Sequence, residues 1–206
     1  MPSDRDHTSP ERLVLFTDAV SAIALTLLVL PLLELVPEAS EEGTVGELIS
    51  DHRGELAAFV LSFAVIFRFW WAHHHVFRHV GTLRGPLVLL SACWTFAVVF
   101  MPIPTAIITA YQPSVTSVAL YGGTLCTVSG TLALMSGYAY RHPELSDGRP
   151  PETREEVLGS VTAFVTQLVA TVIGCRFAET VNYWAFLLMF LTGPVEHAIK
   201  QRWRRG

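Results

Sequence analysis

One acidic residue, Asp18, interrupts an otherwise apolar stretch near the start of the chain. A carboxylate inside a long apolar helix costs several kcal/mol unless another group compensates its charge. Two sources of compensation are available in the sequence. Arg12 precedes Asp18 in the same stretch, and a group of histidines follows in the next apolar tract. We therefore expect Asp18 to be a structural partner of Arg12 or of those histidines.

Four histidines lie close together in the second apolar tract, at His73, His74, His75 and His79. His75 and His79 are four residues apart, so they share one face of a helix, as two metal ligands would. No cysteine or carboxylate stands nearby in the sequence at the spacing of a metal site. Metal binding, pH sensing and a structural or interfacial role all stay open, and the third is favoured. We predict no metal site and no cofactor.

The sequence offers no catalytic constellation. Ser21 and Ser62 have no evident base, and a hydroxyl within an apolar helix more often bonds the carbonyl of the preceding turn. The cysteines Cys93, Cys126 and Cys175 lie far apart, each inside an apolar tract, and fit neither a disulfide framework nor a zinc site. We therefore do not expect an enzyme.

The composition indicates a protein embedded in lipid. Of the 206 residues, 51% are hydrophobic and only 16% are charged, whereas a soluble domain is about a quarter charged. A bilayer needs roughly 20 apolar residues per helical span. We predict an all-α integral membrane protein, with one domain over residues 1–206 and no nucleic-acid partner. Its six transmembrane helices should cover about 13–36, 56–80, 87–110, 115–140, 157–177 and 181–199.

The distribution of basic residues predicts the orientation in the membrane. With six spans, twelve of the fourteen lysines and arginines fall on the side that carries both termini. Only Arg53 and Arg176 fall on the other side, together with the acidic first loop, 37–51. We expect a multi-pass protein of the cell membrane with both termini in the cytoplasm.

An apolar stripe runs along the first predicted helix and consists of Ile23, Leu27 and Leu30. At roughly 100° per residue, Thr26 lies at the edge of this stripe and Glu34 returns to it at the outer end. Asp18 lies about 140° away on the same wheel, so the carboxylate and the stripe should have different roles. Taken alone, such a stripe more often packs against another helix of the chain.

Two motifs carry a resemblance to a known family. The first is Arg12-x-x-x-Phe16-Thr17-Asp18, followed by the apolar run 22–30, and the second is the segment 69–74, Phe-Trp-Trp-Ala-His-His. In this order, on adjacent helices, they resemble the signatures of the transmembrane protein 175 family of endolysosomal and bacterial potassium channels. The resemblance covers about the first 80 residues. The chain departs from it at Thr17, where the family usually has serine.

The resemblance implies a homotetramer of six-helix subunits around a central pore lined by the first helix. It implies a potassium-preferring cation channel in which Ile23, Leu27 and Leu30 form the constriction. Thr26 would then contribute to ion preference, and Glu34 could concentrate cations at the pore mouth. The motif residues would form a structural network within the subunit, made of Arg12, Phe16, Thr17, Asp18, Trp70, His73 and His74.

Two features of the sequence bear on how such a protein would conduct. The chain has no Thr-Val-Gly-Tyr-Gly loop, so an apolar constriction that blocks ions by dewetting replaces a filter of backbone carbonyls. A secondary transporter for a small cation or solute is the alternative, because Pro102 and Pro104 interrupt the third span as broken transporter helices are interrupted. No matching break is evident in another half of the sequence.

Overall fold

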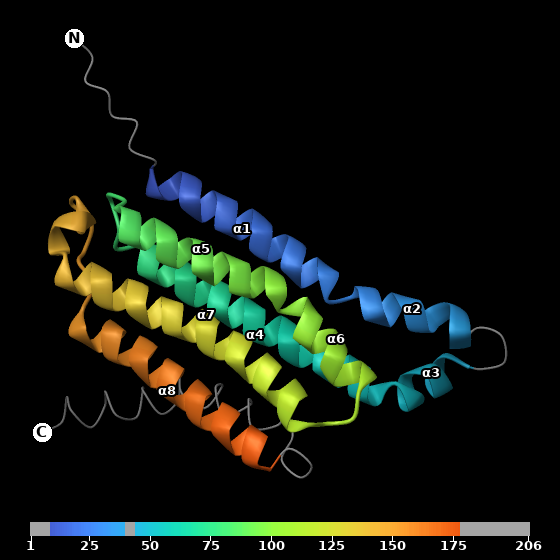
Figure 1. The fold of residues 1–206 in the computed structure, drawn as a ribbon. Helices are drawn as coiled ribbons and strands as arrows, with labels where there is room; N and C mark the ends of the chain where they lie inside the picture. Colours follow the sequence, from blue (N-terminus) through green and yellow to red (C-terminus); the bar gives the residue numbers. More distant parts are fainter. Residues whose placement is uncertain (1–8, 40–43, 178–206) are drawn as a thin grey trace, which may run out of the picture.

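The structure is a computed structural model, and it describes residues 9–39 and 44–177. In this part of the chain all regular structure is helical, and the long helices lie side by side along one direction (Figure 1). The α-helices are α1 (Pro10–Leu27), α2 (Leu30–Ala39), α3 (Val45–Asp51), α4 (Arg53–Phe77), α5 (Gly85–Phe100), α6 (Pro102–Ala110), α7 (Val115–Arg141) and α8 (Arg154–Arg176). A 3-10 turn, η1 (Pro143–Ser146), precedes α8. The sixth predicted span, 181–199, lies outside the described residues.

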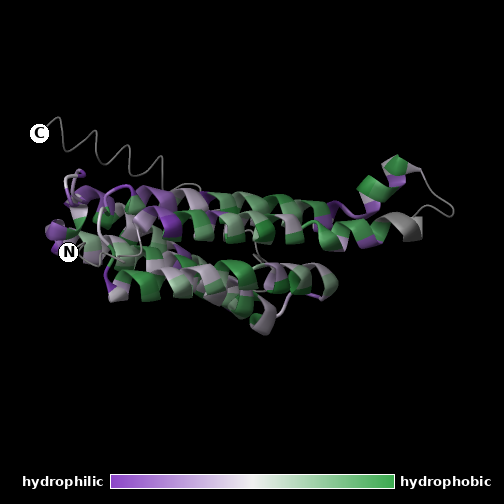
Figure 2. Ribbon diagram, turned by 90° about the horizontal axis from the view of Figure 1, so that it is seen from above, coloured by the Kyte–Doolittle hydropathy of each residue, from purple (hydrophilic) through white to green (hydrophobic). Residues whose placement is uncertain are grey.

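Five segments within the described residues are long and apolar enough to cross a membrane: Pro10–Leu35, Arg53–Phe77, Gly85–Ala110, Val115–Arg141 and Arg154–Arg176. Apolar residues run along their length, while polar residues concentrate in the connections at the ends (Figure 2). The chain is therefore an all-helical, multi-pass membrane protein.

The first span is broken between α1 and α2, at Leu28 and Val29. Pro31 explains the break, because proline has no amide hydrogen and its ring collides with the carbonyl four residues earlier. The backbone compensates with shorter-range bonds, from Val29 N to the Thr26 carbonyl at 3.2 Å. The helical wheel behind the predicted stripe assumes one continuous helix, so it holds for Ile23 and Leu27 and is interrupted before Leu30.

The third span has a break of the same kind between α5 and α6, at Met101. Pro102 begins α6, and Met101 N bonds the Val98 carbonyl three residues back at 3.2 Å. The sequence predicts this interruption from its two prolines. Two of the five described spans thus consist of two helical pieces.

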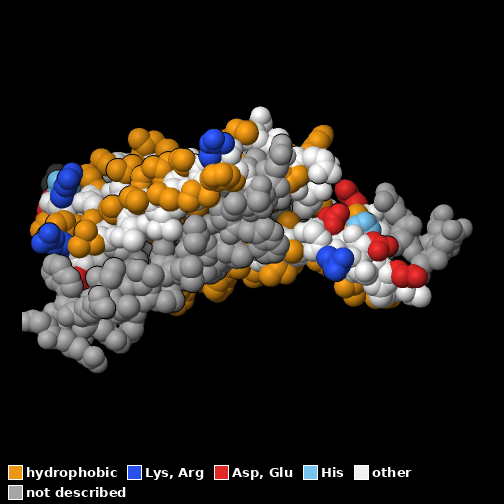
Figure 3. Space-filling view, turned by 90° about the horizontal axis from the view of Figure 1, so that it is seen from below, with side chains coloured by type: hydrophobic (Ala, Val, Ile, Leu, Met, Phe, Trp, Pro, Cys, Tyr) orange, Lys and Arg blue, Asp and Glu red, His pale blue; other side chains and the backbone are white. Residues whose placement is uncertain are grey.

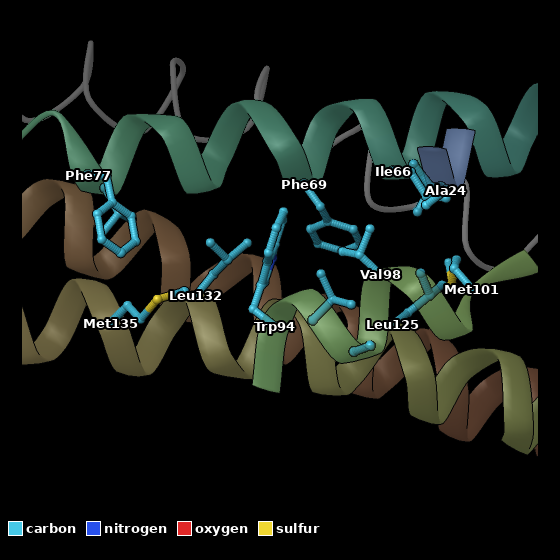
Figure 4. Close-up of a cluster of buried hydrophobic side chains, with 14 of the residues drawn as sticks. Ala24, Ile66, Phe69, Phe77, Trp94, Val98, Met101, Leu125, Leu132 and Met135 are labelled. Carbon is cyan, nitrogen blue, oxygen red and sulfur yellow. The ribbon is translucent and has the colours of Figure 1, made fainter. Parts of the chain in front are cut away.

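The core of the bundle is centred on α7, which packs against α5, α8, α6 and α4. Figure 4 shows Leu125, Leu132 and Met135 of α7 among side chains of α4 and α5, with Trp94 and Phe69 between the helices. Gly122 permits the close approach of α8, because a Cβ there would stand 2.5 Å from a methyl carbon of Thr171. By contrast, α1 lies at the edge of the bundle and packs on α4 and α5 (Figure 1).

Charged side chains gather toward the ends of the molecule. On the face shown in Figure 3, apolar side chains cover much of the middle, and most of the acidic side chains in view lie at the end that carries α3. The opposite end carries the start of α1, the α4–α5 connection and η1 (Figure 1). This separation is the pattern expected of a protein whose middle faces lipid.

Candidate functional site

The apolar stripe of α1 and α2 points away from the rest of the described chain. Ile23 is 59% exposed, Leu27 39% and Leu30 49%. Thr26 and Glu34 are also exposed. The break at Leu28 and Val29 does not bury the outer end of the stripe. Residues 9–39 and 44–177 do not cover this stripe, so it can contact lipid, water or another copy as far as this part of the chain is concerned.

The opposite face of α1 is buried and consists mainly of small side chains. Thr17, Ser21, Ala24 and Leu28 recur at helical spacing, and each is at most 3% exposed. The two hydroxyls bond within the helix, with Thr17 Oγ1 donating to the Val14 carbonyl at 2.8 Å and Ser21 Oγ to the Thr17 carbonyl at 2.7 Å. Small, internally satisfied residues let helices approach closely in a membrane. Because this face packs against the bundle, the opposite side of α1, which carries the stripe, points outward.

Asp18 is held by the second helix. The indole Nε1 of Trp70 donates a hydrogen bond to Asp18 Oδ1 at 2.7 Å. His74 Nδ1 stands 3.9 Å from the same oxygen, and its ring lies 5.8 Å from the Trp70 ring. Because the acceptor is a carboxylate and the distance is short, this hydrogen bond is stronger than one between two neutral groups. The acid that interrupts the first apolar tract thus joins α1 to α4.

Arg12 does not take part in this contact. It lies six residues before Asp18, which is about 120° around the helix, and its side chain is exposed. No ion pair joins Arg12 to Asp18 within residues 9–39 and 44–177. A different arginine anchors the start of α1: Arg149 pairs with Glu11 and donates to the Val80 carbonyl at 2.7 Å.

Two other motif residues lie apart from Asp18. His73 is fully buried, with Nε2 3.2 Å from the Ser91 hydroxyl and its ring stacked 4.2 Å from Trp94. It therefore joins α4 to α5. Phe16 is 59% exposed, although it neighbours buried Thr17. The motif residues thus form one contact between α1 and α4 and one between α4 and α5. Of the others, Thr17 is buried, and Arg12 and Phe16 are exposed.

The fold also brings together residues that the sequence separates widely. Glu156, at the start of α8, lies beside His75 and His79, with its Oε1 3.4 Å and 3.2 Å from their respective Nε2 atoms. Sequence reasoning found the two histidines and no carboxylate near them. No local signal could have supplied one, because about eighty residues separate the histidines from Glu156.

Comparison with known proteins finds a family match for the first half of the chain. A model of the family described as endosomal/lysosomal potassium channel TMEM175 matches residues 12–102. This range contains both motifs, the stripe and the Asp18–Trp70 contact.

Curated relatives extend the match along the chain. The human protein named endosomal/lysosomal proton channel TMEM175 is 24% identical over 204 residues, which cover 92% of this chain and 40% of the human one. A potassium channel of Streptomyces collinus is 36% identical over 100 residues, 48% of each chain. The chain thus spans less than half the length of these relatives.

A solved structure shares the fold. The crystal structure described as a lysosomal potassium-selective channel TMEM175 homolog from Chamaesiphon minutus superposes with a TM-score of 0.60 at 23% identity. The superposition covers 91% of this chain and 97% of that one. The matched motifs make the first half of this chain similar to the TMEM175 family, and the fold is that of the TMEM175 homolog.

Proposed function

We propose that four copies of this chain form a potassium-preferring cation channel whose central pore is lined by α1. One observation carries the proposal: the stripe of Ile23, Leu27 and Leu30 is exposed although α1 is well packed on its other face. Packing within the described chain does not account for the stripe. An assembly in which the first helices surround an axis would give each stripe a function.

The stripe supports a constriction that works by dewetting. A narrow ring of aliphatic side chains excludes water and so blocks ions, and widening the ring lets cations pass with part of their hydration shell. Thr26 at its edge donates its hydroxyl to the Ile23 carbonyl at 2.8 Å. Its oxygen lone pairs then remain free for a passing cation. Glu34 would raise the cation concentration at the outer mouth.

The motif contacts suggest supporting roles inside the subunit. Asp18, Trp70 and His74 would fix the rotation of α1 against α4, while His73 would fix α4 against α5. Thr17 contributes through its buried hydroxyl, whereas Arg12 and Phe16 are exposed and available to a neighbouring subunit. The basic loops favour a cell-membrane protein with both termini in the cytoplasm, and Glu34 would then face outward.

The names of the relatives differ in the permeant ion, so an experiment has to identify the ion that this chain conducts. The bacterial relative from Streptomyces collinus is named a potassium channel, and the human relative is named a proton channel. Purified protein in liposomes under a potassium gradient, with a pH-sensitive dye inside, separates the two ions. We expect passive electrical potassium flux that exceeds sodium flux.

The variant that tests the pore is Ile23→Asn, with Val172→Asn on α8 as the matched control. Both are β-branched aliphatic residues on apolar spans, and their exposed fractions are 59% and 61%. An amide at the constriction keeps water in the pore, so I23N should raise conductance and move the potassium-to-sodium permeability ratio toward one. V172N should leave that ratio at the wild-type value.

The outcomes are distinct. Equal effects of I23N and V172N in planar bilayers would remove Ile23 from the ion path. Native mass spectrometry of the purified protein tests assembly separately, and a mass of four chains is expected. A monomer or dimer that still conducts would refute the proposed tetramer but not the proposed channel function.

A second candidate is a secondary transporter. The breaks at Leu28–Val29 and at Met101 give the chain two discontinuous spans, and such spans build substrate sites in transporters. The same liposomes distinguish the candidates, because transporter flux saturates and requires a coupled ion or co-substrate. Passive, voltage-driven flux would exclude this candidate.

A further inference from the structure

Three nitrogen and oxygen atoms converge where the end of α4 meets the start of α8. Glu156 Oε1 lies 3.4 Å from His75 Nε2 and 3.2 Å from His79 Nε2. One ligand atom from each residue fits within a common limit of 4.8 Å. Zinc ligands stand about 2.0–2.2 Å from the ion, so two ligands of a tetrahedral site lie roughly 3.4 Å apart. The two measured separations match that edge.

The hydrogen bonds of His79 place its hydrogen on Nδ1 and its lone pair on Nε2. The Arg78 guanidinium donates from Nε to His79 Nε2 at 2.9 Å, and an arginine nitrogen cannot accept. His79 Nε2 is therefore the acceptor, and Nδ1 carries the hydrogen that is donated to the Pro150 carbonyl at 2.7 Å. Metal-bound histidines usually have this arrangement, with the second nitrogen donating to a carbonyl that orients the ring.

A cation already occupies the position between these ligand atoms. Arg78 donates from Nη2 to Glu156 Oε1 at 2.8 Å as well as from Nε to His79. Its side chain is 53% exposed, so it can swing into solvent without leaving a buried charge unpaired. The guanidinium and a metal ion would compete for the same two atoms.

A buried carboxylate oxygen next to the cluster has no hydrogen-bond partner. Glu152 has a side chain that is 1% exposed, and its Oε1 accepts from the Ser136 hydroxyl at 2.6 Å. Its Oε2 has no partner among the described residues and lies 4.0 Å from His79 Nε2. An unpaired buried oxygen is costly unless a ligand or ion satisfies it. This observation is independent of the histidine spacing.

We propose that His75, His79 and Glu156 bind a divalent transition-metal ion of the zinc class, with Glu152 Oε2 as the fourth ligand atom. Two imidazoles and carboxylates are a donor set that suits such an ion. The ion displaces Arg78 and clamps the end of α4 to the start of α8. The site lies outside the α1 stripe, so it stands independently of the proposed pore.

The test measures metal binding to the purified full-length chain, in detergent and with a histidine-free purification tag. We expect one Co²⁺ per chain, with the visible absorption of a tetrahedral site, and displacement by one Zn²⁺. His75→Ala should weaken Zn²⁺ binding by at least ~10-fold, because even partners of metal ligands contribute about 10–100-fold. Arg78→Gln should strengthen binding, because it removes the competing cation.

The chain offers a matched control in a second histidine–carboxylate pair. His142 Nδ1 lies 3.1 Å from Glu144 Oε1, in a partly exposed position without a second histidine. His142→Ala should therefore leave Zn²⁺ affinity unchanged. His75 is 40% exposed, so its replacement keeps the chain folded, which size-exclusion chromatography and circular dichroism verify.

Two results would overturn the proposal. Equal Zn²⁺ affinity in wild type, H75A and H142A would mean that the ion binds elsewhere or only adventitiously. If R78Q binds Zn²⁺ no more tightly than the wild type does, Arg78 does not compete with the ion.

Discussion

The helices α1 and α7 are both apolar spans, yet they use their apolar residues in opposite ways. Of the 18 consecutive residues that make up the most apolar stretch of each span, 56% are buried in α7 and 22% in the first span. Leu125 and Met135 of α7 are fully buried, while Ile23 and Leu30 of the first span are about half exposed. Hydropathy alone does not distinguish a helix that holds the subunit together from one that presents a surface.

The two helices also differ in what attaches them to the bundle. Apolar packing and the close fit at Gly122 hold α7. Small side chains hold α1, together with two polar contacts, Asp18 to Trp70 and Glu11 to Arg149. A helix attached through one narrow face can leave the rest of its surface for another copy of the chain. The comparison therefore predicts that substitutions in α7 change stability and that substitutions on the α1 stripe change conduction.

The largest expected effect is the difference in stability between two leucine-to-alanine variants, one on α7 and one on α1. Leu125→Ala removes a fully buried side chain of α7, and such changes cost about 2–5 kcal/mol in protein cores. We expect the lower part of that range, because the unfolded chain stays in apolar surroundings. Leu27→Ala, at a 39% exposed position, should cost little subunit stability. Thermal unfolding in detergent measures both.

Conduction provides the other half of this test. Folded L125A protein in liposomes should keep the wild-type potassium-to-sodium ratio, whereas L27A should lower it. If L27A unfolds as readily as L125A, the stripe is part of the subunit core and the contrast between the helices is lost.

A smaller effect is expected at the contact that attaches α1 to α4. Trp70→Phe removes the donor to Asp18 and should cost about 1–2 kcal/mol, because a partly buried carboxylate loses its hydrogen bond. Asp18→Asn keeps an acceptor oxygen, so its cost should be smaller. Both variants should damage folding or assembly more than permeation. Trp71→Phe, at a neighbouring indole that is 62% exposed, is the control.

Coupling between the two positions decides the origin of this effect. The double variant should cost less than the sum of the single ones, because both remove the same bond. Additive costs would show that Trp70 and Asp18 act separately. A well-assembled Asp18→Asn protein with altered selectivity alone would place Asp18 in the ion path.

The sequence predicts what depends on local chemistry. The all-helical membrane fold follows from the apolar tracts, and the interruption of the third span follows from its prolines. The break in the first span is not predicted, because the apolar run 13–36 is taken as one continuous helix although it contains Pro31. Pro31 gives the same signal as Pro102, so the information was present.

The contacts between distant segments could not be predicted in the same way. The apolar surroundings of Asp18 show that it needs a partner, but the sequence does not choose between the groups that neighbouring helices offer. The structure records Trp70 at hydrogen-bond distance and His74 further away. Arg149 at Glu11 and Glu156 at the histidines come from segments beyond residue 145, where only tertiary packing sets the pairing.

The smallest expected effect concerns α3, which extends the comparison to a helix with no buried residues at all. Its first turn depends on a capping box, in which Glu47 accepts from the Thr44 backbone nitrogen at 2.7 Å and Thr44 Oγ1 accepts from Glu47 N at 3.3 Å. The hydrogen bond from the Thr44 backbone, followed by that from its hydroxyl, lowers the pKa of Glu47 below 4.5. The carboxylate form is thus the one that stabilises the turn.

The sign of the pH effect follows from this direction. Because the folded-state pKa is the lower one, the stabilisation is complete above pH 4.5 and is lost as the pH falls through the folded-state pKa. Acidification should therefore lower the protection of the α3 amides against hydrogen exchange, measured relative to the intrinsic exchange rate at each pH. The start of α7 is the internal control, because its capping box uses the hydroxyls of Ser114 and Ser117, which do not titrate. An equal loss of protection at both sites would mean that the whole bundle loosens in acid, and burial would then not rank α7 above α3 in local stability.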